Sequence, residues 1–138
     1  MRLRILSVTA ASALFAAAAI PALAHHSFAA EFDVTRPVRL SGVVQRMEFS
    51  NPHSWIYIEV TTVDGDVQEW AIEGAAPNAL LRRGWNRNSL PAGTAIDVAG
   101  FQARDRSFRA AGREVTLPDG SNLFVGSTGA GAAPASEE

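Results

Sequence analysis

The three histidines fall in two short segments, and their type and spacing suit metal coordination. His25 and His26 are adjacent, and His53 lies in the run Asn51-Pro-His-Ser-Trp55. If the chain is cleaved after Ala24, His25 offers both its α-amine and its imidazole to one ion. A second imidazole completes a planar nitrogen site, and tetragonal nitrogen geometry favours Cu(II). The sequence therefore predicts a copper site formed by His25 and His53, with His26 as an alternative ligand.

This arrangement resembles the histidine brace of secreted copper proteins, but the same histidines also have an interpretation without metal. The pair at 25–26 is then a polar chain start, and His53 hydrogen-bonds to the backbone of the turn after Pro52. The distance between His25 and His53 would distinguish the metal-binding interpretation from the metal-free one. Imidazole nitrogens more than about 7 Å apart cannot share one ion when each bond is near 2.0–2.1 Å. Because the ligands must be neutral, binding is expected to weaken as the pH falls through about 6.5.

Other catalytic chemistry finds little support. The chain has no cysteine, which excludes a disulfide framework and zinc sites built on thiolates. It also has no G-x-S-x-G elbow, no P-loop and no H-E-x-x-H helix. The acidic residues are scattered and form no evident catalytic pair. We therefore expect a binding module with no catalytic residues.

The first 24 residues are typical of a secretory signal peptide. A basic start at 1–4 precedes an apolar, alanine-rich run at 5–20, and Ala22-Leu-Ala24 supplies a small-x-small cleavage pattern. The apolar run of sixteen residues is shorter than the roughly 20 that span a bilayer. We expect cleavage after Ala24, export to a bacterial periplasm and no membrane span after processing.

Charge limits the partners. The 138 residues carry a formal net charge of -2, and removing 1–24 leaves ten arginines against fourteen acidic residues. An acidic protein is a poor match for phosphate backbones, which need clustered Lys and Arg. We therefore expect no nucleic acid and an unidentified protein or small-molecule partner.

The strands predicted from apolar alternation come in a fixed order. The first covers 38–49, where Gly42 marks a change of phase that suggests a β-bulge placing Val43 on the opposite face. The second and third, at 53–63 and 67–73, are joined at Asp64-Gly65, a two-residue hairpin signal. Trp70 and Ile72 share one face of the third strand.

A short helix and further strands complete the pattern. Pro77 opens the helix, and Gly84 ends it as a left-handed cap. Strands follow at 94–103, 108–117 and 122–125, of which the first two contain Gly100 and Gly112. The order predicts an all-β domain with one short helix, an OB-fold-like five-stranded barrel at 37–126, with a small β-sandwich as the alternative. An N-terminal arm at 25–36 and a disordered tail at 127–138 flank it.

The second strand offers a different binding surface. Trp55 and Tyr57 lie on the face opposite Ile56 and Ile58, so they point outward if the isoleucines fill the interior. Exposed aromatics of this kind could bind a glycan, peptide or protein by stacking. In the alternative that we favour, Phe28 and Phe32 of the arm cover them.

Several motifs together resemble a known family. His25-His-Ser-Phe-Ala-Ala-Glu-Phe-Asp33 is followed by Pro37-Val, Gly42-x-Val44 and Asn51-Pro-His-x-Trp55, and later pieces include Pro77-Asn-x-Leu80, Gly84-Trp85, Pro91-x-Gly93 and Asp119-Gly120. This combination is similar to a family of small exported bacterial proteins classed as a domain of unknown function. The resemblance implies a periplasmic, signal-bearing, β-rich domain and implies no activity.

Overall fold

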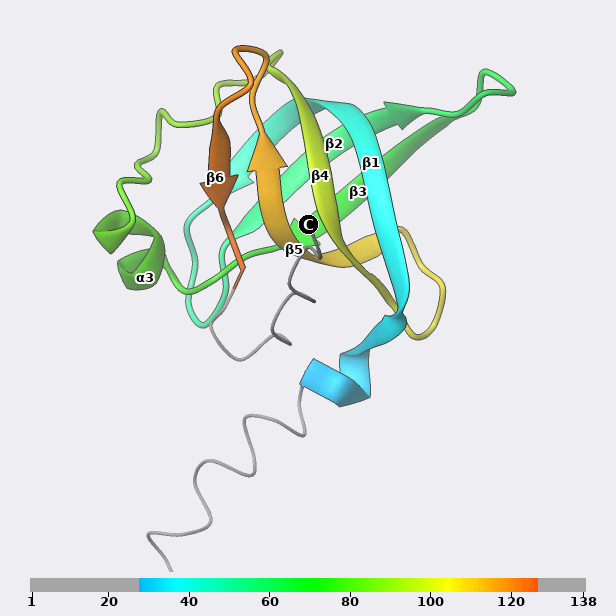
Figure 1. Cartoon of the computed structure of the whole chain (residues 1–138), viewed down its shortest axis with the longest axis horizontal. Helices are drawn as coiled ribbons and strands as arrows, with labels where there is room; N and C mark the ends of the chain where they lie inside the picture. Colours follow the sequence, from blue (N-terminus) through cyan, green and yellow to red (C-terminus); the bar gives the residue numbers. More distant parts are fainter. Residues whose placement is uncertain (1–27, 127–138) are drawn as a thin grey trace, which may run out of the picture.

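The computed structural model describes residues 28–126, and the elements follow the predicted order (Figure 1). The histidines at 25 and 26, the predicted signal peptide and the predicted tail at 127–138 lie outside this range. The elements are β1 (Phe32–Glu48), β2 (Trp55–Thr61), β3 (Val67–Glu73), α3 (Pro77–Arg82), β4 (Ala95–Ala103), β5 (Arg109–Thr116) and β6 (Asn122–Phe124). A helical turn at 28–31 precedes β1. Within residues 28–126, no helix has the length and apolar character needed to cross a membrane.

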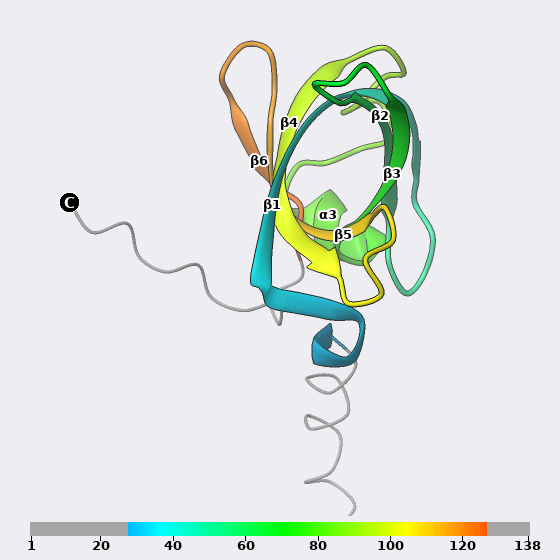
Figure 2. The same cartoon turned by 90° about the vertical axis from the view of Figure 1, so that its right-hand side faces the viewer.

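All six strands belong to one sheet, so the prediction of an all-β domain is confirmed. Their order is β3-β2-β1-β4-β5-β6, with antiparallel neighbours throughout. A short parallel pairing between β3 and β5 joins the two sides of the sheet. Figure 2 shows the five longer strands curving round one interior, with α3 across one end. This curvature places the chain entry into β1 near the starts of β2 and β5.

The long strand β1 differs from the prediction in where its phase changes. Val44 is buried while Val43 is exposed, so the inward alternation runs through Gly42 without a slip. The register instead shifts between Val44 and Arg46, which makes Gln45 the extra residue of a bulge. Gly42 has a different role: a Cβ there would lie 2.7 Å from the carbonyl oxygen of Glu59. Our prediction of the phase change at Gly42 was therefore wrong, because the change lies at Gln45.

The β2–β3 hairpin forms as predicted, with a longer loop. The N–H of Gly65 donates to the carbonyl of Thr62 (3.0 Å), and the N–H of Thr62 donates to that of Asp66 (2.8 Å). Gly65 has a φ of 89°, so a three-residue loop with a left-handed glycine replaces the predicted two-residue turn. This loop sets the register in which Ile56 pairs with Ile72 and Trp55 pairs with Glu73.

Gly84 ends the helix, as predicted, and Gly100 permits a close contact between strands. The N–H of Gly84 donates to the carbonyl of Leu81 (3.1 Å) and that of Trp85 donates to Leu80 (3.0 Å), which is a Schellman motif. In β4 the register shifts between Ala99 and Gly100, where a Cβ on Gly100 would overlap the carbonyl of Ala111.

The core lies between the curved sheet and α3. Its buried members come from every long strand, the helix and the loop after it. They include Val44, Ile56, Ile58, Trp70, Ile72, Leu80, Trp85, Leu90, Ile96, Val98 and Val115. The inward face of β2 is therefore apolar, and the face that carries Trp55 and Tyr57 points outward, as predicted.

Candidate functional site

His53 lies just before β2, beside the last residue of β3. Its Nδ1 is 3.1 Å from Oε1 of Glu73 and 3.4 Å from the carbonyl oxygen of Gly74. A carbonyl oxygen only accepts hydrogen bonds, so this arrangement favours a proton on Nδ1 that is shared between the two acceptors. The other ring nitrogen, Nε2, then carries the lone pair. With 42% of the side chain exposed, His53 can present that nitrogen to an ion.

Glu73 is the more buried partner, and its surroundings perturb its charge. Only 14% of its side chain is exposed. Burial raises the pKa of the Glu73 carboxyl, and the charge of His53 opposes that shift. The nearby carboxylate of Glu31 raises this pKa further, whereas Arg109 lowers it. A carboxylate that orients a ring N–H is the common outer partner of a metal-binding histidine.

Arg109 joins the entry of the chain to this group. Its Nη2 lies 3.3 Å from Oε2 of Glu31, and its guanidinium lies 5.9 Å from the ring centre of Phe32 and 6.0 Å from that of Trp55. We call His53, Trp55, Glu73, Arg109 and Glu31 the His53 cluster. The cluster brings together the residues before β1 and the starts of β2 and β5, which are far apart in the sequence.

Arginines lie over the aromatic rings of the outer face. The guanidinium of Arg46 is 3.5 Å from the ring centre of Tyr57, and Arg109 faces Trp55. Phe28 and Phe32, which we expected to cover these rings, form their own cluster with Ala103 and Ala111. The outer face therefore carries two cation–π pairs, in which a guanidinium group lies over the ring of Tyr57 and another over the ring of Trp55.

Of the three predicted ligands, the structure places His53. Within residues 28–126, no three histidine, aspartate or glutamate side chains gather closely enough to hold a metal. His25 and His26 precede this range. The described chain begins with the turn at 28–31, which is fixed to the β4–β5 loop by a 2.9 Å bond from the N–H of Arg104 to the carbonyl of Glu31.

Sequence reasoning missed Glu73 and Arg109. The predicted two-residue turn would have paired Trp55 with Gly74, whereas the observed three-residue loop pairs it with Glu73, so the length of the loop was the missing signal. For Arg109 the sequence offered no signal. It reaches the cluster through the parallel pairing of Ala71 with Arg109, which joins strands separated by the helix and β4.

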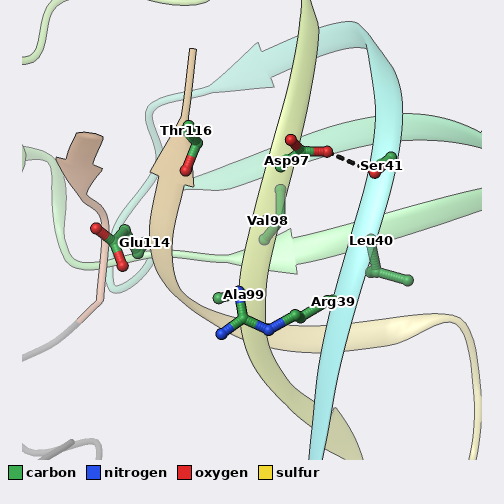
Figure 3. Close-up of a pocket in the computed structure, with 8 residues that line it drawn as sticks. All are labelled: Arg39, Leu40, Ser41, Asp97, Val98, Ala99, Glu114 and Thr116. Carbon is green, nitrogen blue, oxygen red and sulfur yellow. Dashed lines mark hydrogen bonds between the residues drawn. The ribbon is translucent and has the colours of Figure 1, made fainter. Parts of the chain in front are cut away.

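A concave region lies on the outer face of β1, β4 and β5, away from the His53 cluster (Figure 3). It is a polar hollow of about 280 Å³ above Ala99, with Arg39 reaching across β4 in Figure 3. The hydroxyl of Ser41 donates to Oδ1 of Asp97 at 2.5 Å. The rest of its lining includes Glu114 and Thr116. None of the predicted site residues lines this hollow.

Comparison with known proteins identifies one family. The family model described as "Family of unknown function (DUF6152)" matches residues 13–112. No curated protein and no solved structure matches the chain.

Proposed function

The chain belongs to this family of unknown function (DUF6152), and from that premise we propose that it is an exported copper-binding module. In this proposal residues 1–24 are a signal peptide removed after Ala24 in the periplasm. His25 then supplies its amine and imidazole, and His53 supplies Nε2. His26 is the alternative ligand from the same segment. The ion is Cu(II), which heads the divalent affinity order and suits planar nitrogen ligands.

The contact between His53 and Glu73 is the observation that carries the proposal. Nδ1 of His53 lies 3.1 Å from Glu73 and 42% of the side chain is exposed, so Nε2 is the ring nitrogen that would bind the ion. Burying the Glu73 carboxylate costs free energy. In the proposal, binding of the ion by His53 offsets that cost. Glu73 would fix the tautomer and the direction of the ring and would raise the basicity of Nε2.

The anchoring of the chain entry also supports the proposal. Glu31 pairs with Arg109, which faces Trp55, two residues from His53. His25 lies three positions before Phe28, and an extended segment of that length covers roughly 10 Å. A mature N-terminus at His25 would therefore start within reach of the end of the sheet that carries the His53 cluster.

For the fold, we propose an OB-like barrel. Each of the five longer strands pairs with two of the other four, in the order β1-β2-β3-β5-β4 and back to β1. This chain of pairings is compatible with a five-stranded Greek-key barrel closed at one end by α3.

The alternative is a metal-free interaction domain that uses the Trp55 and Tyr57 face for a glycan, peptide or protein. The arginines over both rings make this face less suited to stacking. A ligand would first have to displace the guanidinium groups. We therefore favour the copper site.

The test is a Cu(II) titration of protein recovered from a bacterial periplasm, with the N-terminus confirmed by mass. Electron paramagnetic resonance should show one equivalent of copper with nitrogen ligands. His53→Ala should change the spectrum and weaken binding, and so should one extra residue placed before His25. A His26→Ala variant shows whether His25 or the alternative ligand His26 supplies the N-terminal imidazole.

Two results would count against the site. One is a spectrum that is the same in wild type, in His53→Ala and in the extended protein. The other is a mature N-terminus different from His25. Trp55→Ala tests the alternative: a glycan or peptide that binds the wild type and still binds this variant does not use the aromatic face.

A further inference from the structure

The outer part of the β2–β3 hairpin stands beyond the rest of the sheet. Pairing of β2 with β1 reaches only to Glu59, and β5 pairs with β3 only from Ala71 onward. Residues 60–69, which we call the hairpin ribbon, are therefore paired only within the β2–β3 hairpin in the part of the chain that the structure describes. Figure 1 shows this ribbon projecting away from α3.

The β3 side of the ribbon is an open hydrogen-bonding edge. The N–H of Ala71 donates to the carbonyl of Phe108 at 2.9 Å, on the side that faces β5. Alternate residues of a strand direct their backbone groups to the same side. Val67 and Glu69 therefore direct their N–H and C=O groups to that side too, and no residue in 28–126 pairs with them there.

Apolar side chains border this open edge. Val67 and Phe108 are exposed, and Val63 at the hairpin tip is fully exposed. The ring of Phe108 lies 5.4 Å from that of Trp70, on the inner side of the edge. A strand laid along β3 would cover Val67 on one face and Phe108 on the other.

The charge of the ribbon identifies the kind of strand that fits. Residues 59–69 contain Glu59, Asp64, Asp66 and Glu69 and no arginine. Glu69 lies 3.6 Å from Arg46 of β1, across β2, and both side chains are about half exposed or more. A second copy of this edge would bring like charges together, which is a usual protection against self-pairing. A basic strand would be attracted.

We propose that the open edge of β3 at Val67 and Glu69 binds an extended basic segment of a partner protein by strand addition. Main-chain hydrogen bonds to these two residues provide the affinity, as in other cases of strand addition. The acidic side chains of the ribbon favour a positively charged partner strand. Val67 and Phe108 favour apolar residues at alternate positions of that strand. The surface is separate from the His53 cluster, so this proposal does not depend on copper.

The probe is an acetylated and amidated seven-residue peptide of alternating Lys and Val, followed by amide NMR of the full mature protein. The peptide should slow hydrogen exchange at the amides of Val67 and Glu69. A Glu-Val peptide of the same length should bind at least tenfold more weakly. Glu69→Lys should weaken the Lys-Val peptide about tenfold, since it replaces an exposed attraction by a repulsion. Glu114→Lys on β5 is the matched control and should change little.

Glu69→Pro gives a second test, because it removes one edge N–H while leaving the pairing with β2 intact. Its amide spectrum must show the folded sheet. Binding that survives Glu69→Pro, peptide shifts confined to Trp55 and Tyr57, or equal binding of both peptides would overturn the proposal. Slowed exchange at Val67 that depends on protein concentration, without peptide, would also overturn it in favour of a second copy of this chain.

Discussion

Replacing Glu73 by Gln should weaken Cu(II) binding about tenfold. The contact of Glu73 with Nδ1 of His53 is 3.1 Å long and largely shielded from solvent. Glutamine keeps the size of the side chain and an oxygen that can accept the ring N–H. The substitution therefore removes the negative charge and little else.

The magnitude follows from the type of hydrogen bond. Hydrogen bonds to charged groups contribute about 1.5–3 kcal/mol, and neutral ones about 0.5–1.5 kcal/mol. The difference of roughly 1–1.5 kcal/mol corresponds to about a tenfold change in affinity. Removing the carboxylate altogether, in Glu73→Ala, should cost up to about a hundredfold, the upper end seen for outer partners of metal ligands.

Glu48 offers a matched control. It pairs with Trp55 from the β1 side, as Glu73 does from the β3 side. Its carboxylate contacts Arg46 and is half exposed. Competition of each variant with a chelator of known copper affinity, read by paramagnetic resonance, gives the two dissociation constants. Equal affinities for Glu73→Gln and Glu48→Gln would refute the role assigned to Glu73.

The remaining predictions concern stability. Leu80→Ala should lower the free energy of unfolding by about 2–5 kcal/mol because Leu80 is fully buried, whereas Leu81→Ala, at a neighbour that is 53% exposed, should change it little in the same urea titration. Gly100→Ala should cost about 1–3 kcal/mol by urea titration, because its Cβ meets a backbone carbonyl of β5. Ser54→Ala should leave the melting temperature unchanged or higher, since no described residue bonds the buried hydroxyl; a clear fall would show an unseen partner. Burial raises the pKa of Glu73, so its ionisation disfavours the folded state. Metal-free Glu73→Gln should therefore melt higher than wild type at pH 7, and the gap should close as the pH falls and Glu73 becomes protonated.

Most elements could be predicted because their signals are local. The alternation of Ile56 and Ile58, the glycine at 65 and the Pro77–Gly84 pair each act within a few residues of themselves. The phase change of β1 was misplaced because a glycine suggested it. The bulge lies at Gln45, and Gly42 is required by the approach of Glu59 from the next strand. A close contact between strands leaves no trace in the local pattern.

The site was harder to predict than the fold, for a related reason. His53 was identified by its residue type, but its partner depends on strand register and on burial. Arg109 depends on a parallel pairing between strands that are distant in sequence. The arginines over Trp55 and Tyr57 likewise come from β5 and β1. Their positions follow from tertiary contacts that composition and spacing do not encode.

The core of β2 explains why the contact of His53 with Glu73 is firmly set. Ile56 and Ile58 are fully buried and pair with Ile72 and Trp70. A slip of one residue would turn both isoleucines to solvent, at about 1.5–3 kcal/mol each, so the register is fixed. The same register holds Glu73 opposite Trp55, next to His53. If the proposed site is correct, a core substitution that keeps the register should therefore lower stability without changing copper affinity, whereas a change in Glu73 should alter copper affinity with little loss of stability.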